Sequence, residues 1–363
     1  MRAKWSVAAA LGVALTLAPG LRAGAEPAGR TIRLVAESVS LIGGLQPRFV
    51  IDARITPGDS AFNSEVQGWL AALPPGSGSD TLEGSCVEAQ CAVTAALSAG
   101  KMALSADFAG SGPPSVGRLI LSDDDGRKIG ESAMKLTPIT GPVPGLGELA
   151  PVGAVGALEL SDILMWSGSP TDFSHVEEGP VSWLQRQALA EWQAQQKRHA
   201  NGLILKDELA LLRQRADKAR AAAGWAAMGD PPHGWTAGYP AALLPRAQVV
   251  NRREKRFSSA DGRAMLMIAV QPPMAPKAFD AFVLQQTADR PGVTNRSYTR
   301  VNDDMEITYQ QDGKVVSAAF HNRAGGFARL EFSRPVENGQ IYAPFDKILP
   351  RSLRVTDALA PIP

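Results

Sequence analysis

Hydrophobic and polar positions alternate along much of the first third of the chain. In Thr31–Val35 and Arg48–Ile55, apolar side chains recur at every second position, which is typical of strands with one buried face. A further run, Arg118–Ile129, is interrupted by an Asp-Gly pair that favours a tight hairpin turn. The spacing over Phe62–Leu73 instead predicts a short helix. We expect residues 26–140 to form a β-rich domain of immunoglobulin-like size.

The apolar spacing changes to a helical period in the middle of the chain. Three amphipathic helices are expected, over Ala157–Trp166, Val181–Gln196 and Leu205–Ala223. Three apolar stripes of this kind can bury one another in a compact bundle, which we place at residues 157–215. A linker rich in Pro and Gly is expected before it, at 141–156, and a helical extension and second linker after it, at 216–233.

The last segment, residues 234–363, mixes both periods. It contains a predicted hairpin around Asp261-Gly262, a helix over Pro276–Ala288, four further strands and a closing helix over Tyr342–Leu349. This order predicts an α+β sandwich. The expected fold class is therefore a multidomain α+β protein with an N-terminal β-rich domain, a central three-helix bundle and a C-terminal α+β sandwich.

The first 25 residues have the pattern of a cleavable signal peptide. Arg2 and Lys4 precede an apolar core, Val7–Leu17, and Ala23–Ala25 is a small-x-small cleavage site. An uncleaved anchor is the alternative. We expect a periplasmic or secreted protein with no membrane-spanning segment after removal of residues 1–25.

Two cysteines, Cys86 and Cys91, are present in the whole chain. Because an exported protein meets an oxidising compartment, we expect them to form a disulfide. Closing so short a loop would stabilise the fold by roughly 2 kcal/mol. A metal site is not expected, because no histidine precedes His175 and no His-x-x-x-His spacing occurs.

Part of the helical segment resembles a family of small three-helix peptidoglycan-binding domains. The matching features span about residues 157–213 and are the apolar stretch Leu160–Trp166, then Gln187–Leu189 with Trp192-Gln193, the turn Gly202–Leu205, and Leu209 with Leu212. The resemblance implies a groove that offers aromatic faces to sugar rings and polar groups to a peptide. The ligand-binding candidates that it suggests are Trp166, Phe173, Trp183 and Arg186.

Tryptophans at helical spacing also have a purely structural interpretation. Trp166 and Trp192 fall on the apolar stripes, where core residues are expected. The sequence also departs from the family, because Thr171–Gly179 lacks the Asp-Gly turn that usually follows the first helix. The C-terminal segment is loosely similar to the PsbP/Mog1-type fold in its order of strands and helices.

A basic run lies near the start of the C-terminal segment, where Lys and Arg outnumber Asp and Glu. Its members are Arg252, Arg253, Lys255 and Arg256. They are candidates for contact with an anionic surface such as lipid or wall polymer. The alternative is a solvated strand end. Nucleic acid is not an expected partner of an exported protein.

The sequence predicts no catalytic residues and no cofactor. Its four histidines, His175, His199, His233 and His321, are scattered, and no Gly-x-Ser-x-Gly turn is present. The expected function is that of a non-catalytic cell-envelope protein that binds peptidoglycan or another envelope component. The alternatives are a structural or interaction protein in which the helices are only a spacer, and a hydrolase of an unrecognised kind using His321. The sequence does not predict the oligomeric state.

Overall fold

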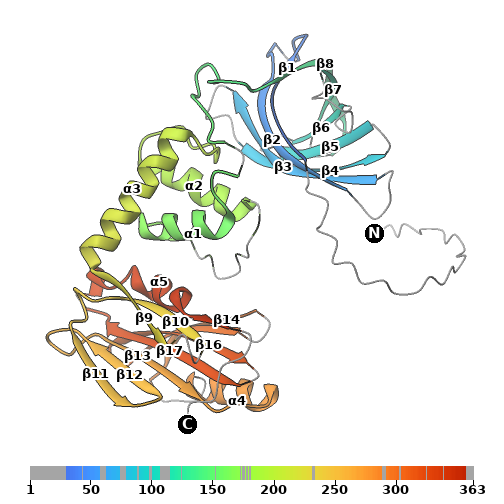
Figure 1. The fold of residues 1–363 in the computed structure, drawn as a ribbon. Helices are drawn as coiled ribbons and strands as arrows, with labels where there is room; N and C mark the ends of the chain where they lie inside the picture. The colour runs from blue at the N-terminus through green and yellow to red at the C-terminus, as the bar shows by residue number, and fades with distance from the viewer. Residues whose placement is uncertain are drawn as a thin grey trace, which may run out of the picture.

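The computed structural model describes residues 30–356, except 43, 58–62, 74–78, 88–89, 98–99, 107–114, 124, 152, 172, 174–175, 177–178, 180, 231–233, 288–291, 302–303, 324 and 338. The predicted signal peptide therefore lies outside the described residues. The chain divides visually into a barrel, a helical segment and a C-terminal region built on a sheet (Figure 1).

The first region is a closed barrel of eight antiparallel strands, each paired with its neighbour in sequence, with β1 also paired with β8. The strands are β1 (Arg30–Ser38), β2 (Arg48–Pro57), β3 (Asn63–Leu73), β4 (Ser79–Val87), β5 (Gln90–Leu97), β6 (Gly100–Ala106), β7 (Val116–Ser122) and β8 (Lys128–Pro138). Closure leaves no free sheet edge. The predicted β-rich character and the hairpin between β7 and β8 are confirmed.

Apolar side chains fill the interior of the barrel. Leu34, Ile51, Leu82 and Leu119 are fully buried there, as the alternation in their strands predicts. The predicted disulfide is confirmed: Cys86 of β4 pairs with Cys91 of β5, and both side chains belong to this interior cluster. The bond therefore joins neighbouring strands inside the barrel core.

The helix predicted over Phe62–Leu73 is wrong, because this segment contains strand β3. Its pattern does not alternate because both of its faces are buried. Val66 and Leu70 point into the barrel, whereas Trp69 and Leu73 join a second apolar cluster on the outside. A strand covered on both faces reads as a continuous apolar run, which is easily mistaken for a helix.

Three helices follow the barrel: α1 (Ala157–Trp166), α2 (Trp183–Gln195) and α3 (Lys206–Ala223). The N-terminus of α2 is fixed by Gln185, whose Oε1 accepts a hydrogen bond from the backbone N–H of Ser182 at 2.5 Å. Helix α3 ends at Gly224, which has φ of 59°. This left-handed conformation favours glycine and turns the chain into the next strand.

The C-terminal region contains two antiparallel sheets. A three-stranded sheet has the order β18-β10-β9, and a seven-stranded sheet has the order β11-β12-β13-β17-β16-β15-β14. The strands are β9 (Trp225–Asp230), β10 (Trp235–Pro240), β11 (Arg246–Asn251), β12 (Glu254–Ser258), β13 (Met265–Gln271), β14 (Thr294–Val301), β15 (Asp304–Gln311), β16 (Lys314–Arg323), β17 (Gly326–Pro335) and β18 (Arg354–Val355).

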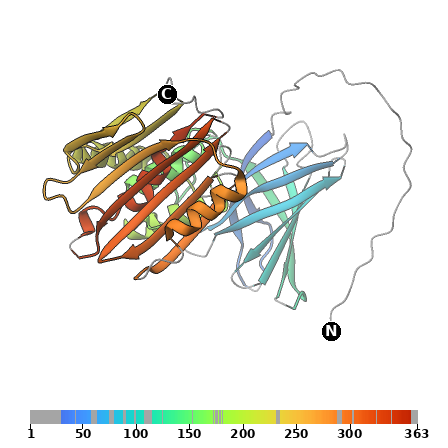
Figure 2. The same cartoon turned by 90° about the horizontal axis from the view of Figure 1, so that it is seen from below.

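Two helices cover opposite faces of the seven-stranded sheet. Helix α4 (Pro276–Thr287) buries Phe279 and Val283 against Met305, Ile307 and Phe320, and Figure 2 shows it lying across the sheet. Helix α5 (Phe345–Ser352), which follows a short 3-10 turn at Gly339–Ile341, packs on the other face. The helix predicted over Pro276–Ala288 and the hairpin around Asp261-Gly262 are confirmed.

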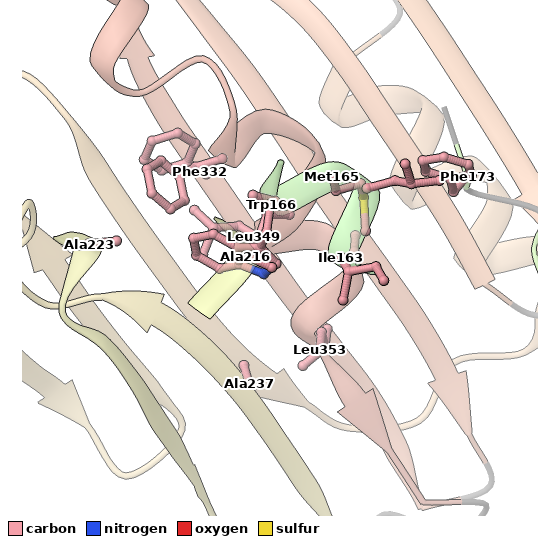
Figure 3. Close-up of a cluster of buried hydrophobic side chains, with 14 of the residues drawn as sticks. Ile163, Met165, Trp166, Phe173, Ala216, Ala223, Ala237, Phe332, Leu349 and Leu353 are labelled. Carbon is pink, nitrogen blue, oxygen red and sulfur yellow. The ribbon is translucent and has the colours of Figure 1, made fainter. Parts of the chain in front are cut away.

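The predicted fold class, a multidomain α+β protein with a central three-helix bundle, is wrong. Strands make up 49% of the structure and helices 23%, so the protein is mostly β, with a closed barrel that was not predicted. The three central helices lie where the periodicity predicts, but they do not form an independent bundle. Their apolar stripes share one core with α5 and with the seven-stranded sheet. Figure 3 shows Trp166 of α1 beside Leu349 of α5, with Phe332 of β17 nearby.

Candidate functional site: a cationic cleft beside the barrel

Three side chains form a row across the outer surface of the barrel. The strand register places Arg33 of β1 opposite Asp52 of β2, and Asp52 opposite Trp69 of β3. Arg33 donates from Nε to Asp52 Oδ1 and from Nη2 to Asp52 Oδ2, both at 3.1 Å. This two-point contact fixes the carboxylate against the barrel wall.

Arg186 of α2 completes this row from the helical side. Its Nη2 donates to Asp52 Oδ2 at 3.1 Å, its Nη1 donates to the carbonyl of Gly202 at 3.3 Å, and its guanidinium carbon lies 6.0 Å from the centre of the Trp69 ring. The side chains of Asp52 and Arg186 are 8% and 11% exposed. One buried carboxylate is therefore shared by two guanidinium groups from different parts of the fold.

The charges of this cluster keep Asp52 ionised. Burial alone raises the pKa of a carboxyl group, but the charges and hydrogen bonds of Arg186 and Arg33 outweigh it, and the pKa of Asp52 is lowered. Burial lowers the pKa of Arg186, and Asp52 opposes this effect. Because arginine stays protonated in proteins, the cluster of two guanidiniums and one carboxylate carries one net positive charge.

The same region holds the barrel against the helices. Trp69 Nε1 donates to the carbonyl of Asn201 at 2.8 Å, and Trp69 also packs in an apolar cluster with Leu146, Leu149 and Leu203. Gly202 has φ of 66°, and a Cβ there would lie 2.9 Å from the Trp69 ring. The close approach of barrel and helices therefore requires glycine at this position.

A cleft of about 680 Å³ opens beside the arginine–aspartate cluster. Strands β1 to β4 form one wall, and the segment before α1 and the start of α2 form the other. Gly156 and Ser182, the N-cap residues of α1 and α2, both line it. The N-terminus of a helix favours negative charge, so both helix ends add positive potential to the cleft.

Arg54 is the cleft residue best placed to engage a ligand. It lies two residues beyond Asp52 on the same outer face of β2, it is half-buried, and no acidic partner contacts it within the described part of the chain. The cleft is lined by Arg33, Arg54 and Arg186 against Asp52 and Glu83, an excess of one positive charge. Its chemistry suits a carboxylate or another anion.

A second pocket, of about 500 Å³, lies between α1, α5 and the seven-stranded sheet. His321 Nδ1 lies 3.0 Å from Asp304 Oδ2 in this pocket, which Ser352 also lines. The hydroxyl of Ser352 lies 2.8 Å from the carbonyl of Leu349 and 3.2 Å from that of Gly238, as a donor to these backbone groups. The Ser352 hydroxyl is therefore directed at backbone carbonyls, and among the described residues it makes no hydrogen bond with His321.

The four ligand-binding residues predicted from sequence are not brought together. Trp166 is 8% exposed and lines the second pocket, whereas Arg186 lines the barrel cleft. Phe173 is fully buried in the main core and does not reach either site. The side chain of Trp183 lies outside the described part of the structure, although its backbone begins α2.

The predicted basic run spans the turn between β11 and β12 and continues into β12. Arg252 and Arg253 occupy the exposed turn. Arg256 donates from Nε to Glu254 at 2.6 Å, and the Lys255 ammonium lies 5.6 Å from the centre of the Trp235 ring. Since Lys255 and Arg256 are engaged within the protein, the run does not form one continuous basic face.

Sequence reasoning missed the barrel half of the cleft, namely Arg33, Asp52 and Arg54. One signal was available, because aspartate is depleted in strands and Asp52 nevertheless occupies a polar position within the strand predicted over Arg48–Ile55. Its partner Arg186 is far away in sequence, and no spacing rule connects the two. The pairing of Asp304 with His321 was likewise visible only after the register of β15 and β16 was known.

Comparison with known proteins does not assign a family. No protein-family model matches the chain, and no curated protein matches it. Among solved structures, the solution structure of cyanobacterial PsbP (CyanoP) from Synechocystis sp. PCC 6803 covers 36% of this chain and 92% of its own, with 11% identity and a TM-score of 0.29. This weak likeness to a PsbP protein assigns neither fold nor function. The expected peptidoglycan-binding domain is not found by any of these comparisons.

One further observation bears on location. The disulfide between Cys86 and Cys91 is compatible with an exported protein. Within the described residues, none of the helices combines the length and the apolar character that crossing a membrane requires. Groups of three or more His, Cys, Asp or Glu side chains suited to a metal ion are also absent from this part of the chain.

Proposed function

We propose that the protein is an exported, non-catalytic envelope protein that binds an anionic wall fragment in the cleft between the barrel and the helices. The single observation that carries this proposal is the position of Arg54, which has no acidic partner among the described residues, beside the largely buried Arg33–Asp52–Arg186 cluster. Two helix N-termini line the same cleft and add to its attraction for anions.

The proposed ligand class is a peptide that carries several free carboxylates, as the stem peptides of peptidoglycan do. Arg54 would hold one carboxylate by a two-point hydrogen-bonded ion pair. Asp52 would take no direct part, because both of its oxygens already accept hydrogen bonds from Arg33 or Arg186. Its role would be to hold the two arginines in place.

Co-sedimentation with insoluble peptidoglycan tests this function. The mature wild-type protein should appear in the pellet at low salt, and less of it at high salt, because salt screens exposed charges. Arg54→Gln should shift the protein to the supernatant. Arg127→Gln, which removes an exposed arginine from the turn between β7 and β8, should not. Full recovery of the wild-type protein in the supernatant would favour a structural or interaction role.

A further inference from the structure

The second pocket, near His321, has two chemically different walls. One is aromatic: Trp166 and Trp225 line the pocket and meet edge to face with ring centres 4.9 Å apart. Phe345, which is not a lining residue, stacks on Trp225 at 6.5 Å. Packing on several sides fixes these rings, so this wall exists before any ligand arrives. Trp225 also lies against Gly238, where a Cβ would come within 2.0 Å of the ring.

The lining residues from β14, β15 and β16 are rich in hydrogen-bond acceptors. Asp304 lies opposite His321 in the pairing of β15 with β16, and Glu306 lies two residues further along the same face of β15. Thr299 of β14 lies opposite Glu306 and adds a hydroxyl. All four side chains line the pocket, so a ligand there would meet two carboxylates, an imidazole and a hydroxyl on one side.

Asp304 also determines which nitrogen of His321 serves a ligand. Arg323 holds both oxygens of Asp304, with contacts of 2.6 and 3.1 Å. His321 Nδ1 lies 3.0 Å from Asp304 Oδ2 but is poorly aligned for a hydrogen bond, so the contact acts mainly through charge. In a neutral imidazole, a carboxylate beside Nδ1 favours the proton on that nitrogen, and Nε2 can then accept a hydrogen bond.

The other charges of the pocket are balanced within the protein. Arg220 forms an ion pair with Asp162 and lies 5.6 Å from the centre of the Trp166 ring. Arg323 offsets Asp304. These pairs cancel, and Arg351 and Arg354 line the pocket together with Glu306, so the pocket has no strong preference for an anionic ligand.

We propose that this pocket binds a neutral sugar ring. Its hydroxyl groups would donate to His321 and Glu306, and its apolar face would rest on Trp166 and Trp225. The volume of about 500 Å³ is within the range of small-molecule sites. This pocket is separate from the cationic cleft, so the sugar site does not depend on the function proposed for that cleft.

Calorimetric titration with triacetylchitotriose tests the proposal. Wild-type protein should bind this neutral trisaccharide. His321→Phe, which keeps a ring but removes both nitrogens, and Thr299→Val, which removes only the hydroxyl, should bind at least tenfold and at least threefold more weakly, respectively. The second variant is nearly isosteric, which guards against loss of the fold.

Two controls separate this site from other surfaces. Thr137→Val, at an exposed position on β8, and Arg54→Gln, in the barrel cleft, should both leave the sugar affinity unchanged. The proposal is overturned if millimolar trisaccharide produces no binding to the wild-type protein, or if all four variants bind it equally well.

Discussion

Arg186 on α2 and Asp52 on β2 are 134 residues apart in sequence, yet Nη2 of the arginine lies 3.1 Å from Oδ2 of the aspartate. The contact joins the barrel to the helical segment. Because Arg33 holds the same carboxylate from the barrel side, Asp52 is the counter-charge of two largely buried guanidiniums. Asp52 therefore helps to hold the barrel against the helices, and its charge also sets the net charge of the candidate ligand cleft.

Replacing Asp52 by asparagine should strongly destabilise the protein. Two largely buried guanidiniums would lose their counter-charge, and breaking a buried ion pair costs up to about 3–5 kcal/mol. Urea unfolding measures the change. Asp217→Asn, which breaks an exposed ion pair with Arg220, should cost less than about 1 kcal/mol. Equal losses for the two variants would show that the cluster is no more important than a surface pair.

Gly202→Ala should weaken the docking of the barrel on the helices. The residue has φ of 66°, and an added Cβ would lie 2.8 Å from the carbonyl of Arg186 and 2.9 Å from the Trp69 ring. Gly153→Ala is a matched control, because Gly153 has φ of 74° but no atom within 4 Å of the added carbon. Both variants incur left-handed strain of about 1–2 kcal/mol. Thermal unfolding should show a clearly larger loss at Gly202, and identical losses would contradict the close contact.

The unfolding free energy should depend on pH through Asp304. Burial raises the pKa of this carboxyl, but contacts from His321 and Arg323 outweigh it and lower the pKa to about 2. An unfolded aspartate titrates near about 3.9. A lowered folded-state pKa stabilises the fold above the unfolded value, and this stabilisation is lost as pH falls from about 4 toward 2. Asp304→Asn should flatten this part of the pH profile, measured by urea unfolding; an unchanged slope would argue against the charged contact.

Removing the disulfide should destabilise the barrel moderately. Replacing both Cys86 and Cys91 by alanine opens a short loop between β4 and β5, and the chain-entropy model gives a loss of about 2 kcal/mol. The reduced wild-type protein should show a similar loss in guanidinium unfolding, whereas reductant should not change the double variant. A reductant effect on the double variant would point to a cause other than this bond.

The local pattern predicted elements better than it predicted their arrangement. The helical stripes of Ala157–Trp166 and Leu205–Ala223 were visible because each helix has one apolar face. Which surface those stripes cover was not visible, since Leu164 and Leu212 share a core with Leu330 and Leu349 from the end of the chain. Apolar periodicity indicates that one face of a helix is buried, but it does not indicate which element covers that face.

Strand β3, in contrast, is an element whose type was predicted wrongly. Trp69 and Leu73 face outward from the barrel and are buried by the linker and the helices, so the strand lacks the polar alternation that identifies an exposed sheet.

The candidate cleft also depends on how the barrel packs against the helices. Arg186 was identified from the sequence as a ligand-binding candidate. Its contact with Asp52, however, depends on the register of β1 to β3 and on the close approach of barrel and helices at Gly202.

The most direct test of the cationic cleft is calorimetric titration with a soluble, sugar-free stem peptide that carries several carboxylates. Wild-type protein and Arg127→Gln should bind it with the same affinity, and Arg54→Gln should bind it at least tenfold more weakly, because a hydrogen-bonded charge pair contributes about 1.5–3 kcal/mol. Absence of binding to the wild-type protein, or an unchanged affinity in Arg54→Gln, would contradict an anion site in this cleft.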